Sequence, residues 1–270
     1  MLKSCSMKRL TITDIQRMKN IRPIVCLTSY TNSITLALDK HVDIILVGDS
    51  LGSTIYGMKN TRSVSLDMMK RHGKTVVNAS NNSFTIIDMP YKSYLNNRSA
   101  YKNASGLLKF TGCQSVKLET NEKNVGIVSY LAKKKVKVIS HIGVTPQDYK
   151  DFSKIRAVGR TEKERKRLIN LALKLEEAGS VLLLLECIVK DVAMEITSLV
   201  KIPTIGIGSS AYCDGQVLVI NDLLGLKSDF FKPKFVKSYA NLSSIIKNSV
   251  KKFSNEVKKG KFPNNKYSYK

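Results

Sequence analysis

Short apolar runs recur along the whole chain, and polar or amphipathic segments separate them. Eight of these runs are rich in Val, Ile, Leu and Thr and have the length of a strand rather than a helix. They occupy residues 24–28, 42–47, 84–87, 115–118, 136–139, 181–185, 203–207 and 216–220. Because helical patterns fall between these runs, the sequence predicts an α/β fold in which strands and helices alternate.

The clearest helix follows the fifth of these runs. Residues 161–164 read Thr-Glu-Lys-Glu, a capping-box pattern that predicts a helix N-terminus. Apolar residues keep helical spacing behind it, namely Leu168, Leu171, Leu175 and Ala178. Gly179 is a natural C-terminal stop for this helix. Weaker helical patterns cover residues 101–110 and 191–199, and residues 242–259 predict a terminal helix packed on the outside of the fold.

Eight strands with intervening helices favour one (β/α)₈ TIM barrel. Such barrels run to about 250 residues, so residues 1–270 are expected to form a single barrel domain with a C-terminal helix and a Lys-rich tail. The alternative is a doubly wound open sheet. That fold normally has fewer strands, and no Gly-x-Gly-x-x-Gly motif follows the first run here.

The charge of the chain is strongly positive. Lys and Arg number 45 and Asp and Glu 21, which gives a formal charge of +24. Only 10 of the 45 cations are Arg, the residue best suited to bidentate recognition of phosphates and bases. Eleven lysines follow Phe231, against the single acid Glu256. We expect a solvated basic surface and no nucleic-acid partner. A basic nucleic-acid-binding protein that uses this tail stays the alternative, and it predicts salt-sensitive binding.

Several classes of protein are excluded by what the sequence lacks. No apolar run reaches 18 residues, so no transmembrane span is predicted. The first twenty residues have no apolar core, so we expect no secretory signal and a cytoplasmic protein. The cysteines are Cys5, Cys26, Cys113, Cys187 and Cys213. Their odd number and wide spacing argue against a disulfide framework or a zinc site. Cys187 is interpreted as a small hydrophobic residue rather than a nucleophile.

Ionisable residues follow the predicted strands at five successive places. In chain order they are Asp49 with Ser50, Asp88, Lys117 with Glu119, His141, and Glu186. In a barrel enzyme the chemistry lies at the C-terminal ends of the strands. One such residue alone would indicate a cap or an ion pair, whereas five strands converging on one rim indicate a functional site.

The residue types at this rim indicate a particular chemistry. Asp49, Asp88 and Glu119 offer the oxygen ligands that Mg²⁺ prefers. Lys117 lies two residues before Glu119, so both should point to the same side of the strand and favour an anionic substrate. Glu186 is available as an acid or base. An α-keto acid fits these groups, and the residues predict Mg²⁺-dependent enolate or C–C bond chemistry on a small keto acid.

Longer segments, in collinear order, are similar to one known family. They read LVGDSLGSTIYG at 46–57, IDMPY at 87–91, SY at 93–94, SVKLE at 115–119, SHIGVTPQ at 140–147, LALKLEEAGSVLLLLEC at 171–187, IPTIGIGSSAYCDGQVLVINDLLGL at 202–226 and PKFVKSYA at 233–240. In these segments the chain resembles the ketopantoate hydroxymethyltransferase family.

The resemblance implies a fold, a reaction and an assembly. The fold is a barrel of the phosphoenolpyruvate mutase/isocitrate lyase type. The reaction transfers a hydroxymethyl group from 5,10-methylenetetrahydrofolate to 3-methyl-2-oxobutanoate through a Mg²⁺-stabilised enolate. It yields 2-dehydropantoate for the synthesis of pantothenate, a coenzyme A precursor. The family forms large homo-oligomers, typically decamers.

The resemblance also implies a role for each rim residue. The Mg²⁺ ligands match Asp49, Asp88 and Glu119, and the proton acceptor matches Glu186. The substrate-binding positions match Asp49, Ser50, Asp88 and Lys117, and His141 is expected to line the same pocket in a supporting role.

The chain departs from the family pattern in several loops. Thr120 and Asn121 stand where the family usually has two glycines, and Ser210 replaces the last glycine of a Gly-Ile-Gly-Ala-Gly run. Since the matched ligand, substrate and base positions are all retained, an active enzyme is expected rather than a decayed copy. The alternative is another Mg²⁺-dependent keto-acid lyase or mutase on the same barrel. Such enzymes usually carry a Lys-x-Cys-Gly-His loop, which is absent.

Overall fold

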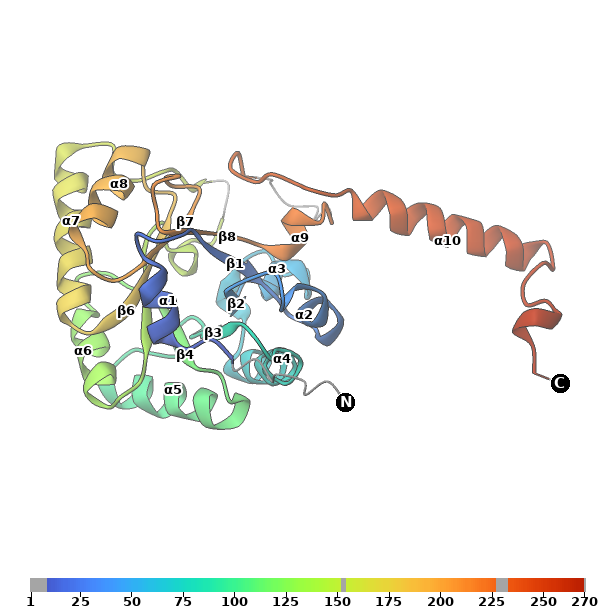
Figure 1. The fold of residues 1–270 in the computed structure, drawn as a ribbon, viewed down its shortest axis with the longest axis horizontal. Coiled ribbons are helices and arrows are strands. Elements are labelled where there is room, and N and C mark those ends of the chain that lie inside the picture. Colours follow the sequence, from blue (N-terminus) through green and yellow to red (C-terminus); the bar gives the residue numbers. More distant parts are fainter. Residues whose placement is uncertain (1–8, 152–153, 227–232, 270) are drawn as a thin grey trace.

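Eight parallel strands close into a barrel in which each strand pairs with its neighbours in the sequence and β8 pairs with β1 (Figure 1). This computed structural model describes residues 9–151, 154–226 and 233–269. The expected absence of a secretory signal concerns the first twenty residues. Of these, the first eight, which include Cys5, lie outside the described residues. The (β/α)₈ barrel expected from the alternating pattern is confirmed, and an open doubly wound sheet is excluded.

The strands alternate with helices along the chain. The strands are β1 (Ile24–Thr28), β2 (Ile44–Val47), β3 (Phe84–Asp88), β4 (Ser115–Glu119), β5 (Val138–Gly143), β6 (Ser180–Glu186), β7 (Thr204–Ile207) and β8 (Gly215–Leu218). The α-helices are α1 (Ile12–Met18), α2 (Asn32–Leu38), α3 (Leu51–Thr54), α4 (Leu66–Ala79), α5 (Asn97–Thr111), α6 (Val125–Lys133), α7 (Glu162–Glu177), α8 (Lys190–Leu199), α9 (Ile220–Leu223) and α10 (Leu242–Lys258). Short 3₁₀ turns are η1 (Thr61–Ser63), η2 (Pro146–Asp148) and η4 (Asn265–Tyr267).

All eight predicted strands are present, but their ends differ. The fifth was predicted over 136–139 and spans Val138–Gly143, so His141 lies within the strand instead of after it. The eighth ends at Leu218 instead of residue 220, because Ile220 turns inward as the first residue of α9 and is buried. The capping box at α7 is also confirmed, since the Thr161 hydroxyl accepts from the Glu164 N–H. Gly179 follows this helix with a φ of +98°, a left-handed conformation that only glycine adopts without strain.

The strand register places the ionisable residues beside one another. Asp88 on β3 lies next to Lys117 on β4, and Glu119 on β4 lies next to His141 on β5. Glu186 ends β6 beside the end of β5. Because parallel strands in a barrel end at the same rim, this register gathers the five side chains at the C-terminal mouth.

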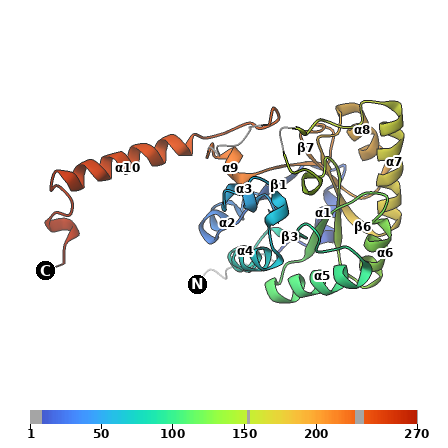
Figure 2. The same ribbon diagram turned by 180° about the vertical axis from the view of Figure 1, so that it is seen from behind.

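The C-terminal helix α10 differs from its prediction. The helix forms over the expected residues, but the expectation that it packs on the outside of the barrel is wrong. None of its residues is buried, and two opposite views show it extending away from the barrel (Figures 1 and 2). Its lysines favour solvent, and its apolar residues stay at least partly exposed. Phe253 makes an edge-to-face contact with the ring of Phe262, 5.4 Å away, in the segment that follows the helix. In that part of the chain no helix is long and apolar enough to cross a membrane.

Candidate active site at the barrel mouth

The predicted site residues all line one cavity of about 420 Å³ at the C-terminal ends of the strands. They are Asp49, Ser50, Asp88, Lys117, Glu119, His141 and Glu186. The structure therefore brings together every residue that the sequence placed at the rim. Described residues of the loops that follow β2, β5, β6 and α9 complete the walls.

A buried pair of carboxylates shares one lysine at the floor of this cavity. The Asp49 N–H donates to Asp88 Oδ2 over 3.0 Å. Lys117 Nζ lies 3.0 Å from Asp88 Oδ1 as a buried ion pair. No other described donor reaches this oxygen. An acceptor buried in this way favours a cation as its partner.

Gln147 connects the carboxylates that lie on either side of the mouth. Its side-chain amide donates to Asp49 Oδ2 over 2.8 Å, and its backbone N–H donates to Glu119 Oε2 over 3.0 Å. The Tyr94 hydroxyl donates to its amide oxygen over 2.6 Å. Gln147 was not among the site residues predicted from the sequence. Its position at the end of the SHIGVTPQ segment could have indicated a role in the site.

The acids of the floor are electrostatically crowded. Burial, and then the charge of Asp88, raises the pKa of Asp49 to about 7. Burial and then Asp49 raise the pKa of Glu119 well above its usual range. For Lys117, burial alone would lower the pKa, but the neighbouring carboxylates outweigh burial and raise it. One ammonium group thus faces an excess of carboxylates, which a divalent cation would relieve.

The donor set suits Mg²⁺ with few protein ligands. Among the described residues, no group of three or more His, Cys, Asp and Glu side chains is arranged to hold a metal ion unaided. Mg²⁺ usually takes one or two carboxylates and completes its octahedron with water and substrate oxygens. Asp49 and Asp88 fit that pattern, because the ion pair with Lys117 is the one contact that the described residues give to Asp88 Oδ1. Glu119 as a third ligand stays a prediction.

A second chain of contacts leads from Lys117 to Glu186. Lys117 Nζ lies 3.4 Å from His141 Nδ1, and an ammonium group can only donate. Nδ1 therefore accepts and the proton of the neutral ring is on Nε2, which lies 3.3 Å from Glu186 Oε2 without hydrogen-bond alignment. Burial and then the charge of Lys117 lower the pKa of His141, so the ring stays neutral. It directs an N–H toward the candidate base.

Ser50 lies at the opposite side of the mouth with a partner from the segment that follows β1. Its hydroxyl and that of Tyr30 are 2.7 Å apart. Burial raises the pKa of Tyr30 to about 12, so this phenol stays protonated. Tyr30 was not predicted as a site residue, because no ionisable residue directly follows the first strand. The hydroxyl of Tyr30, two residues beyond the end of the first strand at Thr28, could have indicated a residue of the barrel mouth.

Two residues that the sequence left in question have ordinary structural roles. Burial and then Glu186 raise the pKa of the Cys187 thiol to about 12, which supports its interpretation as a structural residue. Thr120 donates through both its N–H and its hydroxyl to the His141 carbonyl. Neither Thr120 nor Asn121 has a positive φ, so this loop does not need the glycines that the family has there.

Comparison with known proteins gives one family over almost the whole chain. The profile of ketopantoate hydroxymethyltransferase matches residues 9–265. The 3-methyl-2-oxobutanoate hydroxymethyltransferase of Anaplasma marginale (strain St. Maries) is 43% identical over 260 residues, covering 96% of this chain and 93% of the relative. The protein of that name from Rhizobium rhizogenes (strain K84) is 44% identical over 263 residues, covering 97% and 96%.

Solved structures give the same barrel type. The crystal structure of 2,3-dimethylmalate lyase, a PEP mutase/isocitrate lyase superfamily member, matches with a TM-score of 0.61 and 13% identity, over 96% of this chain and 92% of that one. Phosphonopyruvate hydrolase in complex with oxalate and Mg²⁺ matches with a TM-score of 0.61 and 11% identity, over 96% and 93%. The predicted fold type is thereby confirmed. At such low identity these structures show the fold alone.

Proposed function

This chain belongs to the ketopantoate hydroxymethyltransferase family, and we propose that it transfers a hydroxymethyl group from 5,10-methylenetetrahydrofolate to 3-methyl-2-oxobutanoate, giving 2-dehydropantoate for pantothenate synthesis. The observation that carries the proposal is the convergence of Asp49, Asp88 and Lys117 with Glu186 on one cavity. These groups supply the anion-binding, metal-binding and proton-accepting functions that the reaction needs.

Mg²⁺ is the proposed cofactor, held by Asp49 and Asp88 with Glu119 beside them. Support comes from the crowding of buried carboxylates around the single ammonium group of Lys117, and from the fold relative that is described with oxalate and Mg²⁺. When bound, the metal would polarise the keto acid and stabilise the negative charge of its enolate.

The other residues of the cavity have separate tasks in this proposal. Lys117 attracts the substrate carboxylate, and Ser50 donates a hydrogen bond to it. Glu186 accepts the proton that leaves the carbon next to the ketone, the carbon that then bonds to the incoming one-carbon unit. The neutral ring of His141 positions Glu186 by directing its Nε2–H at the carboxylate.

An assay of product formation tests the proposal directly. Purified protein with Mg²⁺, 3-methyl-2-oxobutanoate and methylenetetrahydrofolate should form 2-dehydropantoate, measured by mass spectrometry, and omission of either substrate should abolish it. The alternative, another Mg²⁺-dependent keto-acid lyase or mutase, predicts cleavage or rearrangement of a keto acid without folate. Failure of the wild-type protein to form 2-dehydropantoate would contradict the proposed function.

We also propose a homo-oligomer, which family resemblance predicts to be a decamer, with each chain of residues 1–270 forming one domain in the cytoplasm. Helix α10 supports self-association. Its apolar side chains, spaced along one stripe, are Ile246, Val250, Phe253 and Val257, and each is between 46% and 59% exposed. Their spacing of three to four residues is typical of a helix that packs on another helix. A second copy of the chain would cover this stripe.

One charge on the apolar stripe should weaken this association. Phe253→Glu places a carboxylate where the proposed contact buries an aromatic ring, so we expect a shift to smaller species in light scattering after size exclusion. Asn255→Glu makes a matched change of charge on the Lys-rich side of α10 and should leave the assembly intact. An unchanged mass for Phe253→Glu would argue against α10 as a contact between copies.

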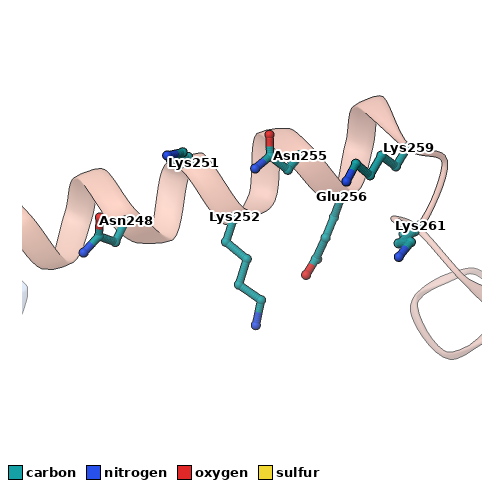
Figure 3. A pocket seen from close by; sticks show the side chains of 7 residues that line it. All are labelled: Asn248, Lys251, Lys252, Asn255, Glu256, Lys259 and Lys261. Atoms are coloured by element: carbon teal, nitrogen blue, oxygen red, sulfur yellow. The ribbon is translucent and has the colours of Figure 1, made fainter.

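The Lys-rich side of α10 carries a second hollow, of about 390 Å³ (Figure 3). It is lined by Asn248, Lys251, Lys252, Asn255, Glu256, Lys259 and Lys261. No aromatic side chain is among them, although single strands of nucleic acid are usually bound by stacking on aromatic rings. The hollow therefore gives the nucleic-acid hypothesis no support beyond charge, and we propose that small molecules and copies of the chain are the partners.

A further inference from the structure

The cavity at the barrel mouth has more room than the keto acid and metal need. Its volume of about 420 Å³ lies within the roughly 300–1,000 Å³ of pockets that bind drug-sized ligands. The floor groups that would hold a five-carbon keto acid all belong to strand ends. Above them, two loops line the same cavity and have no part in the metal or keto-acid contacts described above.

These two loops come from distant parts of the chain. Residues 155–157 follow η2, and residues 233–235 follow α9. Each contributes an apolar side chain and a cation, namely Ile155 with Arg156 and Phe235 with Lys234. Arg156 and Lys234 are exposed at the rim, whereas Ile155 and Phe235 are half-buried. Apolar surface thus lies inside a positively charged edge.

Phe235 is held in place by the end of β7. A Cβ on Gly208 would lie 2.5 Å from Cδ1 of the Phe235 ring, and Gly208 has a φ of +60°. Glycine therefore allows the ring to lie directly against the backbone beyond Ile207. An aromatic ring fixed in this way, while also lining the cavity, is a preformed surface for a planar ligand.

We propose that this outer part of the cavity is the subsite for the folate co-substrate. Phe235 and Ile155 contact its aromatic part, and Arg156 and Lys234 bind the carboxylates of its glutamate tail. The inference rests on the proposed function and adds where the one-carbon donor binds.

The charges of the cavity also orient the ligand. The strand ends carry the carboxylates of Asp49, Asp88, Glu119 and Glu186, which repel a glutamate tail. Among the described lining residues outside the strand ends, Arg156 and Lys234 outnumber the single acid Asp222 on α9. A folate molecule therefore enters with its tail at the rim and its one-carbon group toward the floor. That orientation brings the carbon to be transferred to the end of the cavity where Glu186 lies.

Binding measurements separate this subsite from the keto-acid site. Titration calorimetry with 5-formyltetrahydrofolate, a stable folate, is compared with 5-formyltetrahydropteroate, which lacks the glutamate. Removal of a stacking ring by Phe235→Ala should raise Kd for both probes roughly 10-fold. The double variant Arg156→Ala/Lys234→Ala should raise Kd for the glutamated probe alone, by about 10-fold at low salt and less at high salt.

Controls keep the outcome specific. Lys237→Ala removes an exposed lysine that does not line the cavity and should change neither Kd. Phe235→Leu keeps the apolar bulk and should preserve the melting temperature while still weakening folate binding. Binding of 3-methyl-2-oxobutanoate should change less than twofold in all variants. If the Phe235 and Arg156/Lys234 variants lost affinity for the keto acid and for folate equally, or kept their folate affinity, the proposed subsite would be wrong. Absence of folate binding and of product in the wild-type protein would instead refute the proposed function.

Discussion

Glu186→Gln is expected to lower kcat for 2-dehydropantoate formation by about 10²–10⁴-fold, the usual contribution of a general base. The side chain ends β6, is 19% exposed and faces the cavity. Glutamine has almost the same shape and can lie at the same distance from His141 Nε2, but it cannot take a proton. The fold, the Mg²⁺ affinity and the keto-acid affinity should therefore be nearly unchanged.

Exchange of the substrate proton with solvent gives the decisive measurement for this variant. The wild-type protein with Mg²⁺ and no folate should exchange the proton next to the ketone into deuterated water, as followed by NMR, and Glu186→Gln should lose this exchange. Glu177→Gln, an exposed residue at the end of α7, is the matched control and should exchange normally. If Glu186→Gln retained wild-type exchange, another group would have to be the base.

The fold could be predicted from the sequence because strand and helix signals alternate and agree with each other. The capping box before α7 and the glycine after it mark a helix in two independent ways, and the structure has both features. Strand ends are less certain from sequence. At β8, the apolar Ile220 continues the strand pattern, yet it is buried equally well as the first residue of a short helix.

The site could be predicted in outline because buried charge at a strand end is costly and therefore informative. This reasoning identified Asp88 and Lys117, which form an ion pair across β3 and β4. It could not identify Gln147 or Tyr30, because amides and phenols are common in ordinary loops. Their roles depend on contacts between segments far apart in the chain, which a pattern along the sequence does not contain.

The position of α10 shows another limit of sequence patterns. An apolar stripe indicates that a helix packs on something, but it does not indicate what. Residues 242–259 were expected to pack on the barrel, yet no residue of α10 is buried, and the aromatic contact of Phe253 is with Phe262 just beyond the helix. Because α9 is only four residues long, β8 is not followed by a long helix that packs on the barrel, which is consistent with contacts supplied by another copy.

Asp88→Asn is expected to lower Mg²⁺ affinity by at least about 100-fold and product formation with it, since even indirect partners of a metal contribute 10- to 100-fold. Asp88 Oδ2 accepts from Asp49, while Oδ1 has only the ion pair with Lys117. An asparagine can keep the first contact, but it presents an amide N–H₂ or a neutral oxygen to the metal and the ammonium. Asp67→Asn, an exposed residue on α4, is the matched control and should bind Mg²⁺ normally in calorimetry.

The pH dependence of stability and of Mg²⁺ affinity, compared between the wild-type protein and Asp88→Asn, distinguishes loss of a metal ligand from general damage to the fold. Without metal, the pKa of Asp49 is raised from 3.8 to about 7 by burial and by Asp88. A raised pKa means that the folded protein binds this proton more tightly than the unfolded chain does, so metal-free protein should lose stability as the pH rises from about 4 to about 7. Mg²⁺ must displace the proton, so its apparent affinity should fall toward tenfold per pH unit below pH 7.

In Asp88→Asn the neighbouring charge is gone and the pKa of Asp49 falls, so both the melting-temperature profile and any residual Mg²⁺ binding should shift to lower pH. An unshifted profile would show that Asp88 does not act on Asp49.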